Sequence, residues 1–104
     1  MQYDVFDNPS PRTRDTYPYV LDIQSDLLRS LPTRMVAPLA ATSLAASQLP
    51  SRLCPVIPIN GRKLTLVPFE AAPLDKRFLK KSIANAKNRA DDIVAAMDAV
   101  ISGI

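Results

Sequence analysis

Apolar and polar positions alternate through the first two thirds of the chain. The pattern is clearest over residues 17–24, where the odd-numbered positions carry large apolar or aromatic side chains. A period of two is typical of a strand with one buried face. We expect further strands over residues 2–6, 34–39, 54–59, 62–69 and 76–79. Strands 17–24 and 34–39 follow each other closely and are expected to pair antiparallel, and Pro38 predicts an edge or a strand end.

The remaining local signals are a hairpin and two helical segments. Asn60-Gly61 lies between two apolar runs and predicts a β-hairpin, because a type I′ turn needs positive φ at both central residues. Residues 42–49 predict a short helical turn that ends before Pro50. Residues 84–101 predict the final helix, since they are rich in alanine and their apolar positions recur at steps of three and four.

The order of these elements predicts the class of fold. Strands followed by one C-terminal helix indicate an α+β or mainly β protein, built on an antiparallel sheet or a small, partly open barrel. A length of 104 residues indicates a single domain that spans residues 1–104.

The end of the predicted helix is unusually apolar. Residues 94–101 are apolar except for Asp98, and the sequence closes on Ile104 after Gly103, which stands where a helix C-cap uses a left-handed residue. A helix on the surface of a monomer needs only one apolar stripe. We therefore expect this end of the helix to contact a second surface, and we look for function there.

Composition narrows the chemistry. Histidine is absent, and Cys54 is the single cysteine, so histidine-based catalysis and a multi-cysteine metal site are excluded. Cys54 lies in an apolar run and is expected to be buried. We expect a protein that is not an enzyme and uses no metal or cofactor. With no signal peptide and no apolar run near the ~20 residues that span a bilayer, we expect it in the cytoplasm, with no membrane contact.

Basic residues gather in the last third of a chain whose net charge is +3. This cluster is either a solvated face or a surface for an acidic partner, which could be nucleic acid or an acidic peptide. Its members are Lys76, Arg77, Lys80, Lys81, Lys87 and Arg89.

Several blocks of the sequence resemble the CcdB family of plasmid and chromosomal toxins. The most specific are TYPYVLDIQSDLL at residues 16–28 and RMVAPL at residues 34–39. The start MQYDV, the segment LCPVIPI at residues 53–59 and the final Gly103-Ile104 also fit. The resemblance implies a CcdB/MazF-like, SH3-type barrel: a five-stranded antiparallel sheet with a small extra β lobe and a C-terminal α-helix.

The resemblance also implies a function and partners. The chain would be the toxin of a type II toxin–antitoxin system, a homodimer whose helix tips bind the DNA gyrase A subunit and trap the enzyme on cleaved DNA. Replication and growth would stop until a cognate CcdA-type antitoxin removes the toxin. Toxin and antitoxin together would repress their own operon, with the antitoxin contacting the DNA.

Carried over position by position, the resemblance implies a gyrase-binding surface. Its members are Leu27, Leu28, Asp98, Ile101, Ser102, Gly103 and Ile104. Ile101 and Leu28 could instead be core or dimer contacts, Gly103 a helix cap only and Ser102 a neutral spacer. Lys87 and Arg89 are the expected antitoxin contacts, although both could simply be solvated.

One departure from the family pattern bears on this surface. The family has Trp where this chain has Ser102, and serine cannot stack on an arginine of gyrase. We expect the rest of the tip to compensate. Two alternatives remain open: a chromosomal copy that has lost gyrase poisoning, or a MazF-like endoribonuclease that uses Arg12 and Arg14 to hold phosphate.

Overall fold

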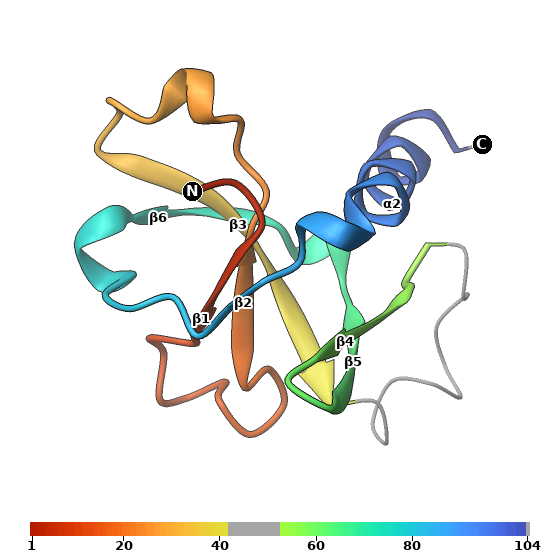
Figure 1. Ribbon diagram of the computed structural model, residues 1–104, viewed down its shortest axis with the longest axis horizontal. Coiled ribbons are helices and arrows are strands. Elements are labelled where there is room, and N and C mark those ends of the chain that lie inside the picture. Colours follow the sequence, from red (N-terminus) through yellow and green to blue (C-terminus); the bar gives the residue numbers. More distant parts are fainter. Residues whose placement is uncertain (42–52, 104) are drawn as a thin grey trace.

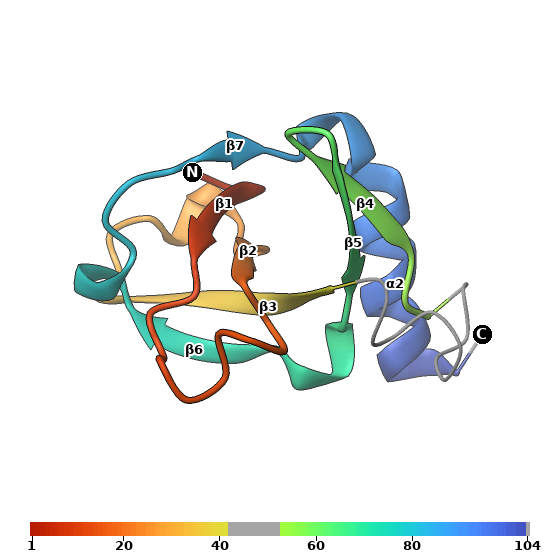
Figure 2. The same ribbon diagram turned by 90° about the horizontal axis from the view of Figure 1, so that it is seen from below.

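Antiparallel strands make up most of the fold (Figure 1). The computed structural model describes residues 1–41 and 53–103. Within these residues seven strands join one sheet: β1 (Asp4–Asp7), β2 (Tyr19–Asp22), β3 (Thr33–Ala41), β4 (Val56–Ile59), β5 (Arg62–Leu66), β6 (Ala72–Asp75) and β7 (Ala84–Asn85). The helix α2 (Ala90–Ser102) follows them and lies on the side of β4 and β5 (Figure 2).

Strand β3 is the centre of the sheet. The strand order is β4-β5-β3-β2-β1-β7, and β6 pairs with β3 outside this path. One edge of β3 pairs with β2, and its other edge pairs with β6 over Thr33–Val36 and with β5 over Leu39–Ala41. The sheet curves into a nearly closed barrel, so the predicted α+β, mainly antiparallel fold with a C-terminal helix is confirmed.

The prediction of an edge or strand end at Pro38 is wrong, because Pro38 pairs with Val20 inside the central strand. The Pro38 carbonyl accepts a hydrogen bond of 3.0 Å from the Val67 amide. The N–H and C=O of a strand residue point to the same side. The donor that proline lacks would therefore face the break between β5 and β6, where no ladder bond is lost.

The predicted hairpin is confirmed. Asn60 and Gly61 have φ of 50° and 81°, and Ile59 pairs with Arg62 across the two-residue turn. Within β4, Ile57 and Ile59 are buried while Val56 and Pro58 are exposed, as expected for a strand with one buried face.

Two apolar clusters lie on opposite faces of the first strands. The main core contains Val5, Leu21, Leu39 and Leu64 together with Ile93 and Ala96 of α2. The next residues along β1 and β2 turn the other way, and Phe6 and Val20 pack with Val36, Leu74 and Leu79. Cys54 is buried, as predicted.

Three predicted elements have wrong bounds. The strand predicted over residues 62–69 ends at Leu66, and Pro68–Glu70 form the 3-10 helix η2. Residues 76–79 do not form a strand: the strand comes earlier, as β6, and Lys76–Phe78 form the 3-10 helix η3, whose first turn is capped by the Asp75 carboxylate. The final helix begins at Ala90 rather than at residue 84, because Ala84 and Asn85 pair with β1 as β7. Sheet pairing here overrides the helical propensity of the alanines. The helical turn predicted over residues 42–49 lies outside the described residues.

Candidate functional site

The last turns of α2 carry apolar side chains on the outer face. Ile93 and Ala96 face the core, whereas Ile101 is 83% exposed, and Val94 and Val100 are also exposed. Asp98 is exposed on the turn before the tip. A soluble helix normally keeps large apolar residues on its packed stripe. The predicted helix tip is therefore present as an apolar surface open to solvent.

The backbone at this tip has a defined ending. Gly103 adopts the left-handed conformation with φ of 73°, and its amide donates to the Ala99 carbonyl at 3.0 Å, so the predicted C-cap is confirmed. The Ser102 hydroxyl donates to the Asp98 carbonyl at 2.7 Å. The hydroxyl is therefore satisfied by its own helix, and Ile101 is the projecting side chain. Ile104 lies outside the described residues.

A second exposed apolar segment is the 3-10 helix η1 (Asp26–Leu28). Leu27 is 93% exposed, and Leu28 and Leu31 are also exposed. The Ser25 hydroxyl accepts from the Leu27 amide at 3.2 Å and caps this turn. Leu31 was not among the predicted contacts, because its exposure depends on how the loop folds back and not on any local pattern.

A buried ion pair holds this loop to the sheet. The Arg34 guanidinium binds both oxygens of Asp22, with Nε to Oδ2 at 2.9 Å and Nη2 to Oδ1 at 3.1 Å, and both side chains are buried. The same Nη2 donates to the Gln24 carbonyl at 2.8 Å. The Gln24 side chain donates to the Thr33 carbonyl at 3.2 Å and accepts from the Met35 amide at 2.9 Å. This ion pair and these hydrogen bonds thus fix the position of the loop that carries the leucines of η1.

One chain does not bring the two predicted gyrase-binding segments together. In Figure 1, η1 is the turn at the upper left, whereas the tip of α2 lies at the right. Leu27 and Leu28 therefore cannot touch the same small site on a partner as Ile101 of the same protomer.

The two predicted antitoxin contacts differ in their surroundings. Lys87 is exposed on the 3-10 helix η4 (Lys87–Arg89) that precedes α2. Arg89 donates to the Asp92 carboxylate at 2.9 Å and to the Val56 carbonyl at 3.2 Å. Arg89 therefore has a structural role in joining the start of α2 to β4, and Lys87 is the freer of the two cations.

The described residues contain little that resembles catalytic or metal-binding machinery. Among them no three histidine, cysteine, aspartate or glutamate side chains form a metal-binding group. Burial raises the pKa of the Cys54 thiol, which keeps it protonated and unreactive. No helix in the described part of the chain has the length and apolarity needed to cross a bilayer.

Comparison with known families agrees with this geometry. The family described as CcdB protein matches residues 2–103 of the 104-residue chain. This chain belongs to the CcdB family. CcdB-family proteins are toxins of toxin–antitoxin systems, so the resemblance noted from residues 16–28 and 34–39 is confirmed over nearly the whole chain.

Proposed function

We propose that this CcdB-family toxin binds the A subunit of DNA gyrase through the tip of α2 and holds the enzyme on cleaved DNA. The observation that carries the proposal is the projecting Ile101, 83% exposed at a capped helix end, in a chain whose family is that of toxins. Such a poison needs no catalytic group. It acts because it binds the cleaved state better than the resealed one and so shifts the population.

The role proposed for Ser102 follows from its hydrogen bond. Serine has no ring that could stack on a partner. Because its hydroxyl donates to the Asp98 carbonyl, Ser102 also brings no unpaired polar group into the contact. Ile101 and Val100 would then supply the binding energy. Gly103 would end the helix directly after Ser102, which would keep the tip narrow enough to enter a groove. Asp98 and Ile104 complete the proposed contact.

The proposed active unit is a homodimer. Two copies would place two α2 tips on the gyrase A-subunit dimer, and a second copy could set Leu27 and Leu28 of one protomer beside the tip of the other. We further propose that a CcdA-type antitoxin with an acidic segment binds near Lys87 and Arg89 and releases gyrase. That complex, located in the cytoplasm, would repress its own operon through the antitoxin's DNA-binding domain.

A supercoiling assay with purified protein, gyrase and plasmid tests the main proposal. Intact toxin should inhibit supercoiling and accumulate cleaved plasmid, and deletion of Gly103-Ile104 should abolish both effects. Ile101→Ala should raise the inhibitory concentration about thirtyfold, since the lost burial is worth about 2 kcal/mol. Val94→Ala is the matched control, because Val94 is exposed on the same helix two turns before the tip.

Three outcomes would contradict the proposal. If intact protein neither inhibits supercoiling nor accumulates cleaved DNA, the chain is a copy that has lost gyrase poisoning. If Val94→Ala weakens inhibition as much as Ile101→Ala, the tip is not the contact. If the protein cleaves RNA at specific sequences and the deletion leaves cleavage unchanged, the endoribonuclease alternative replaces the gyrase proposal.

A further inference from the structure

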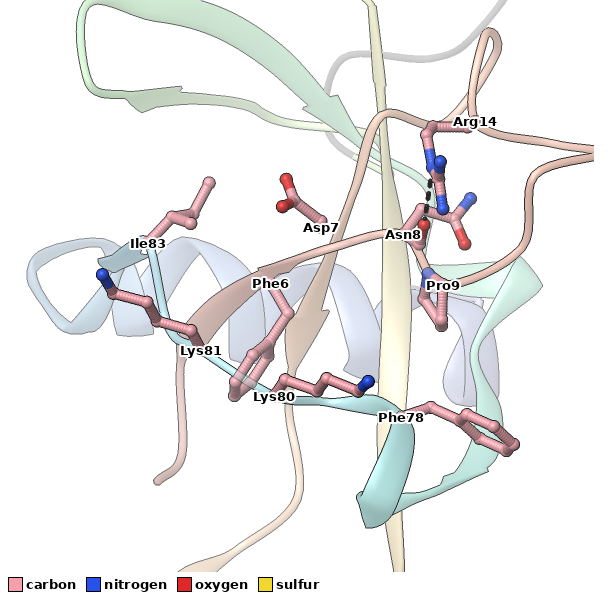
Figure 3. A pocket seen from close by; sticks show the side chains of 9 residues that line it. All are labelled: Phe6, Asp7, Asn8, Pro9, Arg14, Phe78, Lys80, Lys81 and Ile83. Carbon is pink, nitrogen blue, oxygen red and sulfur yellow. Dashed lines mark hydrogen bonds between the residues drawn. The ribbon is translucent and has the colours of Figure 1, made fainter.

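A basic pocket lies away from the tip of α2. It has a volume of about 400 Å³ and opens between the end of β1, the loop that follows it and the segment after η3 (Figure 3). The largely buried ring of Phe6 provides an apolar wall, while Arg14, Lys80, Lys81 and the 57% exposed ring of Phe78 line the rest. In Figure 1 this region is at the opposite end of the molecule from the C-terminus.

The cations of this pocket have no acidic partner among the described residues. Elsewhere on the surface Arg77 pairs with Asp75 and Arg89 pairs with Asp92. No described carboxylate forms an ion pair with Arg14, Lys80 or Lys81, although Asp7 also lines the pocket. Three positive side chains and one negative one leave the pocket with a net positive charge, so it favours an external anion.

The loop beside the pocket is held in place before any ligand arrives. The buried Asn8 side chain donates through Nδ2 to Thr13 Oγ1 at 2.9 Å and to the Tyr17 carbonyl at 2.8 Å. The Arg14 Nε donates to the Asn8 carbonyl at 2.9 Å, the bond drawn in Figure 3. A positioned guanidinium loses less conformational freedom on binding, which raises its affinity for an oxyanion such as a phosphate group.

The aromatic ring distinguishes between possible anions. Carboxylates of an acidic peptide would satisfy the cations and leave the exposed face of Phe78 unused. A single-stranded nucleic acid uses both, because phosphates bind the cations and a base stacks on the ring, the combination found in non-specific single-strand binders.

We propose that this pocket binds single-stranded nucleic acid, with neighbouring backbone phosphates bound by Arg14, Lys80 and Lys81 and a base stacked on Phe78. The proposal concerns binding without cleavage. It stands independently of the gyrase contact, since the two surfaces lie apart in the fold.

Fluorescence anisotropy with labelled eight-nucleotide oligothymidylate and oligouridylate tests the proposal on the full chain. We expect a Kd between about 10⁻⁴ and 10⁻⁶ M, and a plot of log K against log salt concentration with a slope of about −2, as three neutralised phosphates predict. Lys80→Ala should reduce the slope by about 0.7. Phe78→Leu, which keeps an apolar side chain and removes the ring, should weaken binding about 5- to 150-fold with no change of slope.

The controls lie outside the pocket. Lys87→Ala removes the same charge from an exposed site, and Phe69→Leu changes another exposed ring, so each should alter Kd less than twofold. Thermal melting verifies that every variant folds. Stronger binding of either oligonucleotide supports the proposal and identifies the strand it prefers.

The proposal is overturned by any of three results. One is the absence of oligonucleotide binding at about 1 mM protein and low salt. Another is an equal loss of binding for Lys87→Ala and Lys80→Ala, which would show only general charge attraction. The third is displacement by polyglutamate together with no effect of Phe78→Leu, which would assign the pocket to acidic peptides.

Discussion

The tip of α2 and the η1 loop both present apolar side chains to solvent, but they are supported in different ways. Ile101 stands on a regular helix that ends in a single backbone cap at Gly103. Leu27 stands on one turn of 3-10 helix, and that turn is tied to the sheet by Arg34, Asp22 and Gln24. The backbone hydrogen bonds of a helix hold it up to its last turn, whereas a short loop needs hydrogen bonds from side chains outside it to keep its conformation.

This difference separates residues that contact a partner from residues that hold the fold around such contacts. At the tip, a substitution at Ile101 removes a partner contact and leaves the fold unchanged, because Ile101 is 83% exposed. A substitution at Arg34, Asp22 or Gln24, which hold η1 to the sheet, alters the fold of the loop and changes the leucine contacts only as a consequence. Three substitutions break or sharpen the comparison, and a fourth concerns an ion pair outside both regions.

The largest effect is expected from Arg34→Met. It leaves the Asp22 carboxylate buried without its guanidinium, which typically costs about 3–5 kcal/mol. Urea unfolding should show this loss, and Arg77→Met, which breaks an exposed ion pair, should show a much smaller one. Equal losses for the two variants would mean that the buried pair does not support the loop.

Ser102→Trp tests the tip without touching the fold. It restores the aromatic ring of the family pattern at an exposed position, and stacking on an arginine of gyrase is worth about 1–2 kcal/mol. We expect gyrase inhibition at a concentration about 5- to 30-fold lower, with unchanged stability to urea. No gain in inhibition would show that this tip meets gyrase in a different geometry or not at all.

Gln24→Glu loosens the loop with a smaller effect. The carboxylate still accepts from the Met35 amide but loses the donor to the Thr33 carbonyl, at a cost of about 1 kcal/mol. Amide hydrogen exchange should accelerate over residues 26–31 and stay unchanged in α2, which serves as the internal control. Equal acceleration in both regions would indicate global destabilisation.

The smallest effect concerns an exposed ion pair outside both regions. The hydrogen bonds and charge of Arg77 hold the pKa of the Asp75 carboxyl below its ordinary value. The contribution of this pair to stability is therefore present above the ordinary carboxyl pKa and is lost as pH falls through the lowered one. Arg77→Gln should raise the Asp75 pKa part of the way towards its ordinary value in an NMR titration, because the backbone N–H of residue 77 still donates to the carboxylate. An unchanged pKa would contradict the assignment.

Local patterns predicted the parts of the fold that depend on near neighbours. The Asn60-Gly61 turn was predictable because its backbone angles exclude most other residues, and the cap at Gly103 for the same reason. The boundaries at residues 76–79 and 84–89 were not. Pairing of β6 with β3 places the strand before residue 76, and pairing of β7 with β1 delays the helix, so contacts between distant segments decide both boundaries.

The same division applies to the candidate site. Residues 94–101 predicted an apolar helix end, and the blocks at residues 16–28 and 34–39 indicated the family. Neither pattern could show that Ile101 projects, that the Ser102 hydroxyl is satisfied within the helix, or that Arg34 braces the η1 loop.

The sequence by itself therefore determined the family, the hairpin and the presence of an apolar helix end. These depend on residue type and on short spacings along the chain. Only the tertiary structure decided which apolar residues face solvent, where the helix begins, and how Arg14, Lys80 and Phe78 meet at one pocket. These properties depend on long-range pairing across the sheet, which brings together residues that no local pattern connects.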